Sequence, residues 1–123
     1  MTASTTIGHR GLKIERIECI PLSMPLPRTY RGSNYFMTHR CTIVTRLFTS
    51  EGIVGEVYNG DEFETQAEVL KIINEEIAPK IIGMDAFNTE GCWRAMLPAT
   101  YNILRDRKLG TCAMACVDSA IWD

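Results

Sequence analysis

Alternating apolar and polar residues predict a strand near the start of the chain. Residues 12–20 are rich in β-branched side chains, which favour strands. Their alternation changes phase between Ile14 and Ile17, so we predict a bulge within this strand. Residues 1–11 are small and polar and predict a flexible tail.

A clearer alternation follows in residues 41–58. Successive side chains of a strand point to opposite faces, so Ile43, Thr45 and Leu47 share one face of a strand over 41–49. The sequence Ser50-Glu51-Gly52 then provides a turn, and a strand pattern resumes over 53–58. The pattern predicts an antiparallel hairpin.

Helical spacing replaces alternation after this hairpin. Asp61 precedes Glu64 by three residues, which is the spacing of a helix N-terminal cap. The predicted buried face of this helix carries Phe63, Ala67, Leu70, Ile73 and Ile77. Pro79 and Gly83 interrupt the pattern and predict its end.

Two further helices are predicted downstream. One opens at Asp85 and ends near Pro98. Its predicted inward side chains are Trp93, Met96 and Leu97. Residues 99–110 favour no element, and the other helix starts at Thr111. A face of small residues suited to close packing is formed by Ala113, Cys116, Val117, Ala120 and Ile121.

The order of these elements predicts the fold class. Three strands followed by helices, without β/α alternation, indicate an α+β fold with helices on one face of a three-stranded antiparallel meander. A length of 123 residues fits one domain. A sheet this small leaves its other face or an edge in need of a partner.

Composition and charge exclude several classes of protein. A hydrophobic content of 46% with 23% charged residues is that of an ordinary folded, soluble chain. The formal net charge of -2 lacks the basic excess of a nucleic-acid-binding protein. No run of ~18 apolar residues predicts a membrane span, and residues 1–11 lack the apolar stretch of a secretory signal, which predicts a cytoplasmic location.

Two groups of residues have metal-ligand chemistry but also a plain structural interpretation. The odd set of five cysteines argues against a disulfide framework. Cys112 and Cys116 lie four apart on a predicted helix, where they either share a metal or pack as small buried residues. Glu56, Asp61 and Glu62 either form a metal site or occupy strand ends and helix caps.

The segment 21–40 is the strongest candidate for binding. It joins two predicted strands through about twenty residues, whereas hairpin loops need about 2–5. We predict a lid over a polar or anionic ligand, with a solvated connector as the alternative. Its donor and aromatic side chains, with two residues after the third strand, are the candidate substrate-binding residues Arg28, Tyr30, Arg31, Ser33, Asn34, Tyr35, Tyr58 and Asn59.

Arginine is central to this hypothesis because its planar fork of donors matches a carboxylate. Arg28 and Arg31 either hold a substrate acid group or are surface charges, and Tyr58 either contacts the ligand or packs in the fold. The chain has no P-loop, nucleophile elbow or GxGxxG motif. We therefore predict no catalytic residue and no metal ligand within it.

Three motifs resemble one known family. Residues 49–56 (TSEGIVGE) are similar to the T-x-x-G-x-x-G hairpin of mandelate racemase/muconate lactonizing enzymes, which belong to the enolase superfamily. Residues 78–85 (APKIIGMD) occur at the expected distance downstream, and residues 115–123 (ACVDSAIWD) are similar to the A-x-x-D-x-A-L-W-D entry to the family's barrel. The sequence departs from many relatives at Val57-Tyr58-Asn59, so no single relative indicates the substrate.

The resemblance implies a division of labour. Residues 12–110 correspond to the N-terminal capping domain, and residues 111–123 to the first helix leading into a (β/α) barrel that is absent from this chain. In the family the barrel's acidic residues hold Mg²⁺, and its Lys or His removes the proton next to a substrate carboxylate. The capping segment then supplies specificity, water exclusion and oligomer contacts.

The implied function is that of a Mg²⁺-dependent racemase, dehydratase or cycloisomerase of hydroxy or sugar acids. Its partners are its own C-terminal barrel, a small carboxylate substrate and further copies in a homo-oligomer. The alternative is a free-standing, non-catalytic α+β binding or assembly module. Sequence beyond Asp123 distinguishes the two, because a barrel requires about 250 further residues.

Overall fold

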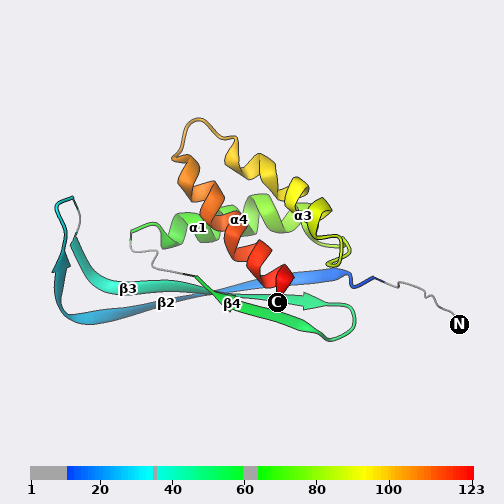
Figure 1. Ribbon diagram of the computed structural model, residues 1–123, viewed down its shortest axis with the longest axis horizontal. Helices are drawn as coiled ribbons and strands as arrows, with labels where there is room; N and C mark the ends of the chain where they lie inside the picture. Colours follow the sequence, from blue (N-terminus) through cyan, green and yellow to red (C-terminus); the bar gives the residue numbers. More distant parts are fainter. Residues whose placement is uncertain (1–10, 35, 60–63) are drawn as a thin grey trace, which may run out of the picture.

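A three-stranded antiparallel sheet forms one layer of the protein, and helices cover one of its faces (Figure 1). The computed structural model describes residues 11–34, 36–59 and 64–123. The strands β2 (Ile14–Arg31), β3 (Phe36–Thr49) and β4 (Val54–Tyr58) are ordered β2-β3-β4. This arrangement confirms the predicted α+β meander.

The helix layer consists of four α-helices and two short turns of other helical types in the described residues. They are α1 (Gln66–Ile72), the π turn η1 (Ile73–Ile77), α2 (Ala78–Ile81), α3 (Thr89–Met96), the 3-10 turn η2 (Leu97–Thr100) and α4 (Arg107–Trp122). None of the helices in these ranges has the length and apolar character needed to cross a membrane.

The hairpin of β3 and β4 confirms the prediction from alternation. Ile43, Thr45 and Leu47 are buried on the helix-covered face. Gly52 forms the turn at a φ of 78°, where an L side chain is strained, and the Thr49 hydroxyl donates to the carbonyl of Ile53 at 2.7 Å. The predicted bulge in the first strand is also present, as a register shift between Ile14 and Arg16.

The prediction of a long connecting loop over 21–40 is wrong. β2 and β3 remain paired from Pro21, opposite Ile43, to Pro25, opposite His39, and pair again after an irregularity. Prolines 21, 25 and 27 are tolerated because β2 is an edge strand, where a missing N–H breaks no ladder on the open side. We call residues 21–34 with 36–43 the ribbon.

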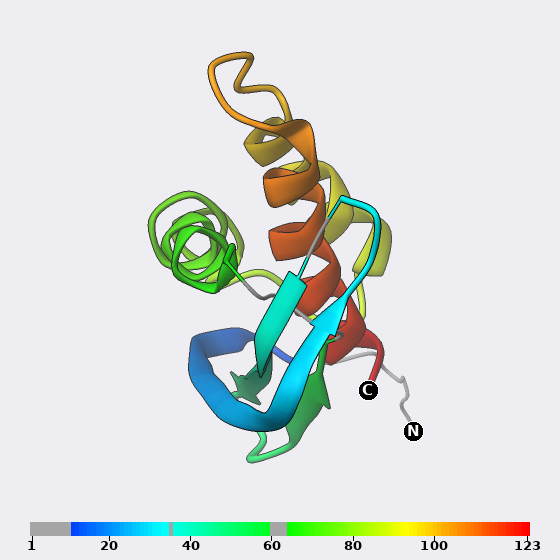
Figure 2. The ribbon, with the colours of Figure 1, turned by 90° about the vertical axis from the view of Figure 1, so that its left-hand side faces the viewer.

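The ribbon projects beyond β4 and past the end of the helix layer. Its tip curves towards the side of the sheet on which the helices lie (Figures 1 and 2). β4 pairs with β3 only from Val44 onwards, so within the described strands the ribbon is two-stranded. It is therefore the part of the fold least supported by the sheet.

The first helix differs from its prediction. The proposed cap Asp61 and the inward Phe63 lie outside the described residues, and Glu64 has a φ of 75°, which is not helical. α1 starts at Gln66. Ile73 and Ile77 are buried as predicted and Leu70 is partly buried, but Ala67 is exposed, and the face is completed by Val69 and Ile72.

Pro79 does not end this helical run. Proline lacks an N–H, and here it follows a π turn, η1, in which the backbone hydrogen-bonding pattern is already shifted. The run continues to Ile81, and Gly83 ends it with a φ of 93°.

The later helices also differ in their limits. Asn88 caps α3 by accepting from the Gly91 N–H at 3.0 Å, so the helix starts after Asp85. Met96 is buried and Leu97 partly buried, but the Trp93 side chain is 44% exposed, contrary to prediction. Cys92, four residues before Met96, takes the inward position instead.

α4 begins at Arg107 rather than Thr111. The Asp106 carboxylate caps it by accepting from the Lys108 N–H at 2.9 Å. The predicted small-residue face is confirmed, with Ala113, Cys116, Val117 and Ala120 buried and Ile121 partly buried. This face lets α4 approach the sheet closely.

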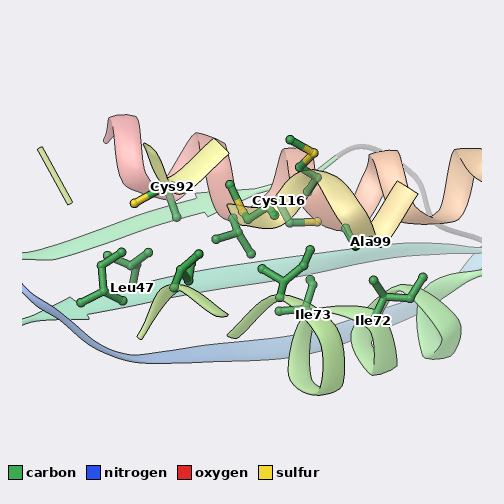
Figure 3. Close-up of a cluster of buried hydrophobic side chains, with 14 of the residues drawn as sticks. Leu47, Ile72, Ile73, Cys92, Ala99 and Cys116 are labelled. Carbon is green, nitrogen blue, oxygen red and sulfur yellow. The ribbon is translucent and has the colours of Figure 1, made fainter. Parts of the chain in front are cut away.

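One hydrophobic core joins the two layers. Leu47 of β3 belongs to the same buried cluster as Ile72, Ile73, Cys92, Ala99 and Cys116 from the helix layer (Figure 3). Cys116 is buried in this core and Cys112 is partly buried against it, as the packing interpretation predicts; Cys41 and Cys92 are buried too. Burial, with a smaller contribution from the Asp85 charge, raises the pKa of Cys92 and keeps it a neutral thiol.

Candidate functional site

Two of the sequence motifs meet in space at the end of α4. A Cβ atom added to Gly55 would lie 2.1 Å from the carbonyl oxygen of Ala120, so only glycine permits this approach of helix to strand. The Asp123 carboxylate accepts from the Glu56 N–H at 3.0 Å. These motif residues hold β4 against α4.

The third motif ties the start of the sheet to the helix layer. The Asp85 carboxylate oxygen Oδ1 accepts from the N–H groups of Leu12, at 2.9 Å, and Phe87, at 3.0 Å. Backbone bonds join Ile14 to Met84 and to Gly83 at 2.9 and 2.7 Å. Asp85 is thus a structural residue in this chain rather than the start of a helix.

The predicted ligand-binding residues fall into two groups. Arg28, Tyr30 and Arg31 lie in the distal part of β2, and Ser33 and Asn34 lie at the bend beyond it; Tyr35 lies outside the described residues. The Arg28 guanidinium stacks on the Tyr30 ring with its carbon 5.1 Å from the ring centre. The structure therefore joins Arg28 to Tyr30, and Arg31, Ser33 and Asn34 follow them along the chain, all exposed at the ribbon tip.

Tyr58 and Asn59 form the second group, at the base of the ribbon. Tyr58 ends β4 opposite Val44 and is 78% exposed. The Asn59 side chain donates to the Cys116 sulfur at 2.6 Å, which links β4 to α4. About eight residues of β3 separate Val44 from Phe36, or roughly 26 Å along a strand, so this group is distant from the tip along the strand.

A pocket at the base of the ribbon was missed by the sequence analysis. It has a volume of about 320 Å³ and is lined by Ser23, His39, Cys41, Glu64, Gln66 and Ala67. The Cys41 thiol donates to the Ser23 hydroxyl at 3.5 Å. The Thr38 hydroxyl and Nδ1 of His39 are hydrogen-bonded at 2.9 Å.

Little in the sequence reveals this pocket. Ser23 and Cys41 become neighbours only through the register of β2 and β3. The one local signal is that Ser23 and His39 are polar, with Ser23 lying between Pro21 and Pro25. Glu64, at a positive φ, is the backbone outlier beside it.

The opposite, helix-free face of the sheet carries an ion-pair network. Arg46 on β3 forms an ion pair through Nε with the Glu56 carboxylate on β4. Its Nη1 atom also lies 3.4 Å from Oε1 of Glu18 on β2. The hydrogen bond that Arg46 donates to Glu56, followed by the negative charge of Glu56, raises the pKa of Arg46. Glu56 is therefore engaged on the strand surface, and no cluster of three or more metal-ligating side chains occurs among the described residues.

Comparison with known proteins shows the family of this chain. A sequence profile of the mandelate racemase/muconate lactonizing enzyme N-terminal domain matches residues 26–123. The chain belongs to this family. The match confirms the resemblance seen in the three motifs.

Two relatives are similar to this chain over about nine-tenths of its length. The chain is 32% identical over 111 residues to a D-galactonate dehydratase family member from Paenibacillus sp. (strain JDR-2), covering 90% of the chain and 23% of the relative. It is 30% identical over 118 residues to chloromuconate cycloisomerase from Cupriavidus pinatubonensis (strain JMP 134 / LMG 1197), covering 91% and 30%. The chain thus spans about a quarter to a third of these relatives.

Solved structures agree with this assignment. A mandelate racemase/muconate lactonizing enzyme crystal structure superposes with a TM-score of 0.88 at 54% identity, covering 91% of the chain and 30% of that protein. A family member from a marine actinobacterium, in complex with magnesium, gives 0.77 at 48% identity, covering 91% and 28%. The α+β layer arrangement is therefore that of the family's N-terminal domain.

Proposed function

We propose that this chain is the substrate-capping domain of a Mg²⁺-dependent enzyme that removes the proton next to a carboxylate. The family supports the reaction class, since the relatives are named as a dehydratase family member and a cycloisomerase. The observation that carries the capping role is the ribbon, which projects past the helix layer (Figure 1) and has Arg28 and Arg31 in the distal part of β2.

The ribbon tip has the chemistry to bind a carboxylate. Arg28 and Arg31 are exposed there, and each guanidinium offers a fork of donors that matches two carboxylate oxygens. Tyr30, Ser33 and Asn34 add hydroxyl, amide and aromatic groups there, and Tyr58 and Asn59 lie at the ribbon base. Tyr35, outside the described residues, stays a candidate from the sequence. Closure of such a surface over a substrate excludes water and orients the acid group.

Metal chemistry is not assigned to this chain. Because the described residues hold no cluster of suitable ligands, they do not fit Mg²⁺. When bound in a barrel domain, Mg²⁺ supplies positive charge that stabilises the carboxylate as its neighbouring proton leaves. We propose that the whole protein carries that barrel, and that it is a cytoplasmic homo-oligomer.

The direct test uses the full-length gene product with Mg²⁺ and a panel of sugar acids, hydroxy acids and amino-acid derivatives. Exchange of the α-proton in D₂O, followed by NMR, should identify the substrate. Failure of exchange on every acid, together with a gene that encodes no barrel after Asp123, would favour the non-catalytic binding module.

Variants of the arginines then test the capping role. Arg28→Ala or Arg31→Ala should remove a charged hydrogen bond worth roughly 1.5–3 kcal/mol, and so lower kcat/KM by about 10- to 150-fold. Arg94→Ala is the matched control, since Arg94 is exposed on α3 and paired with Glu90. If both ribbon variants keep the wild-type kcat/KM, neither Arg28 nor Arg31 binds the substrate carboxylate.

A further inference from the structure

The ribbon needs a support that the sheet does not provide. Isolated two-stranded hairpins are marginally stable in water. The last pair between β3 and β4 joins Val44 to Tyr58, and beyond it β2 and β3 pair with each other. Whatever fixes the direction of the ribbon must therefore act near residues 22 and 42, where it leaves the sheet.

A side chain from the helix layer acts at that point. The Gln66 side-chain amide donates to the carbonyl oxygen of Leu22 at 2.9 Å and to that of Thr42 at 2.7 Å. Leu22 and Thr42 are direct partners in the β2–β3 register. One amide therefore holds both strands of the ribbon, two residues beyond the last pair with β4.

Gln66 is itself well anchored. It is the first residue of α1, whose Val69 and Ile72 are buried in the core. A glutamine amide provides two N–H donors, which suits two carbonyl acceptors. The hydroxyl of Thr42 also donates to the carbonyl of Asn59, so the same segment of β3 is tied to the chain that follows β4.

We propose that Gln66 is a positioning residue that fixes the direction in which the ribbon leaves the sheet. Resting on the proposed function, it thereby sets where Arg28 and Arg31 stand over the substrate carboxylate. Gln66 acts through backbone carbonyls and need not touch the substrate. Its loss should free the ribbon while leaving the core packed.

Hydrogen–deuterium exchange on the full-length protein tests the structural part without any assay of activity. Gln66→Glu keeps the length of the side chain but cannot donate, and Gln66→Met is a second variant without charge. Backbone amides of ribbon residues 37–43 should exchange about tenfold faster, whereas amides of α4 should keep their wild-type rates. The control is Glu68→Gln, a change at an exposed position two residues further along the same helix.

Two results would overturn the positioning role. Ribbon exchange equal to that of the Glu68→Gln control would show that the amide holds nothing. Equal acceleration in the ribbon and in α4 would make Gln66 a general stability residue.

Kinetics of the same variants test the link to substrate. If the arginines bind the substrate carboxylate equally well in the ground state and the transition state, misplacing them should raise KM several-fold and leave kcat nearly unchanged. Faster ribbon exchange with unchanged KM would overturn the link to the substrate and leave α-proton removal itself intact. An enzyme that turns over no acid would instead refute the proposed function, with the exchange experiment still deciding the role of Gln66.

Discussion

Gly55 shows how a family motif acts through packing at the scale of one residue. Its hydrogen atom faces the α4 backbone, and a methyl group there would meet the Ala120 carbonyl oxygen at 2.1 Å. We expect Gly55→Ala to lower the free energy of unfolding by about 2 kcal/mol, as overpacked positions do. Urea unfolding followed by circular dichroism measures this.

The neighbouring position provides the control for this prediction. Val54 is also in β4 but is exposed, so Val54→Ala should cost clearly less. Equal losses in the two variants would mean that the strand, and not its contact with Ala120, sets the cost.

An ion pair makes part of the stability depend on pH. Both carboxylate oxygens of Glu76 accept from Arg105, one of them at 2.9 Å, and Arg105 also donates to the Ala99 carbonyl. The hydrogen bond from Arg105 lowers the pKa of Glu76 below its ordinary value of 4.5. A carboxyl group with a lowered pKa in the folded state stabilises the fold above its unfolded pKa, and this stabilisation is lost as pH falls.

Glu76→Gln should therefore destabilise the protein at pH 7 by about 0.5–1 kcal/mol, a modest value because the carboxylate is partly exposed. The difference from wild type should shrink as pH falls below about 4. Thermal or urea unfolding at several pH values measures it. Glu90→Gln, which breaks the more exposed pair with Arg94, should change stability less; a pH-independent effect at Glu76 would contradict this account.

At the scale of elements, sequence predicts best where one face is buried. The hairpin of β3 and β4 follows from alternation because Ile43, Thr45 and Leu47 really do face the core. The β2 half of the ribbon has largely exposed residues on both faces, so it has no such alternation. Its three prolines are typical of a loop, and the segment is seen to be a strand only from its pairing with β3 in the structure.

Periodicity locates the helices but does not fix which side of each faces the core. It predicts an inward Trp93, yet Cys92 and Met96 define the buried side. The candidate site shows the same limit. Arg28 to Asn34 are contiguous and could be selected from sequence, whereas the contact of Gln66 with Leu22 and Thr42 depends on tertiary placement.

The start of α4 gives a prediction at this scale. Asp106 lies just before the helix and accepts from the Lys108 N–H, which satisfies one of its first free amides. Asp106→Ala should cost about 1 kcal/mol of unfolding free energy, and Asp106→Asn should keep most of it because Asn caps as well. Chemical denaturation compares the three proteins, and equal losses in both variants would show that the cap is not responsible.

At the scale of the molecule, the helix layer and the β3–β4 turn enclose an apolar groove at the end of α4. It has a volume of about 430 Å³ and is lined by residues that include Leu47, Ile53, Phe87, Ile121 and Trp122. Phe87 is 60% exposed and Trp122 is 70% exposed. Contiguous apolar surface of this kind on a folded domain favours association.

We therefore expect the 123-residue chain, produced alone, to self-associate through this groove. Light scattering and sedimentation should show a mass that rises with protein concentration, and the double change Phe87→Ser with Trp122→Ser should reduce it. A second exposed apolar site provides the control, since Ile103 and Leu104 are 93% and 90% exposed on the loop before α4. If replacing these two with Ser reduces association as much as the groove variant does, or if the chain is monomeric at every concentration, the groove is not an associating surface.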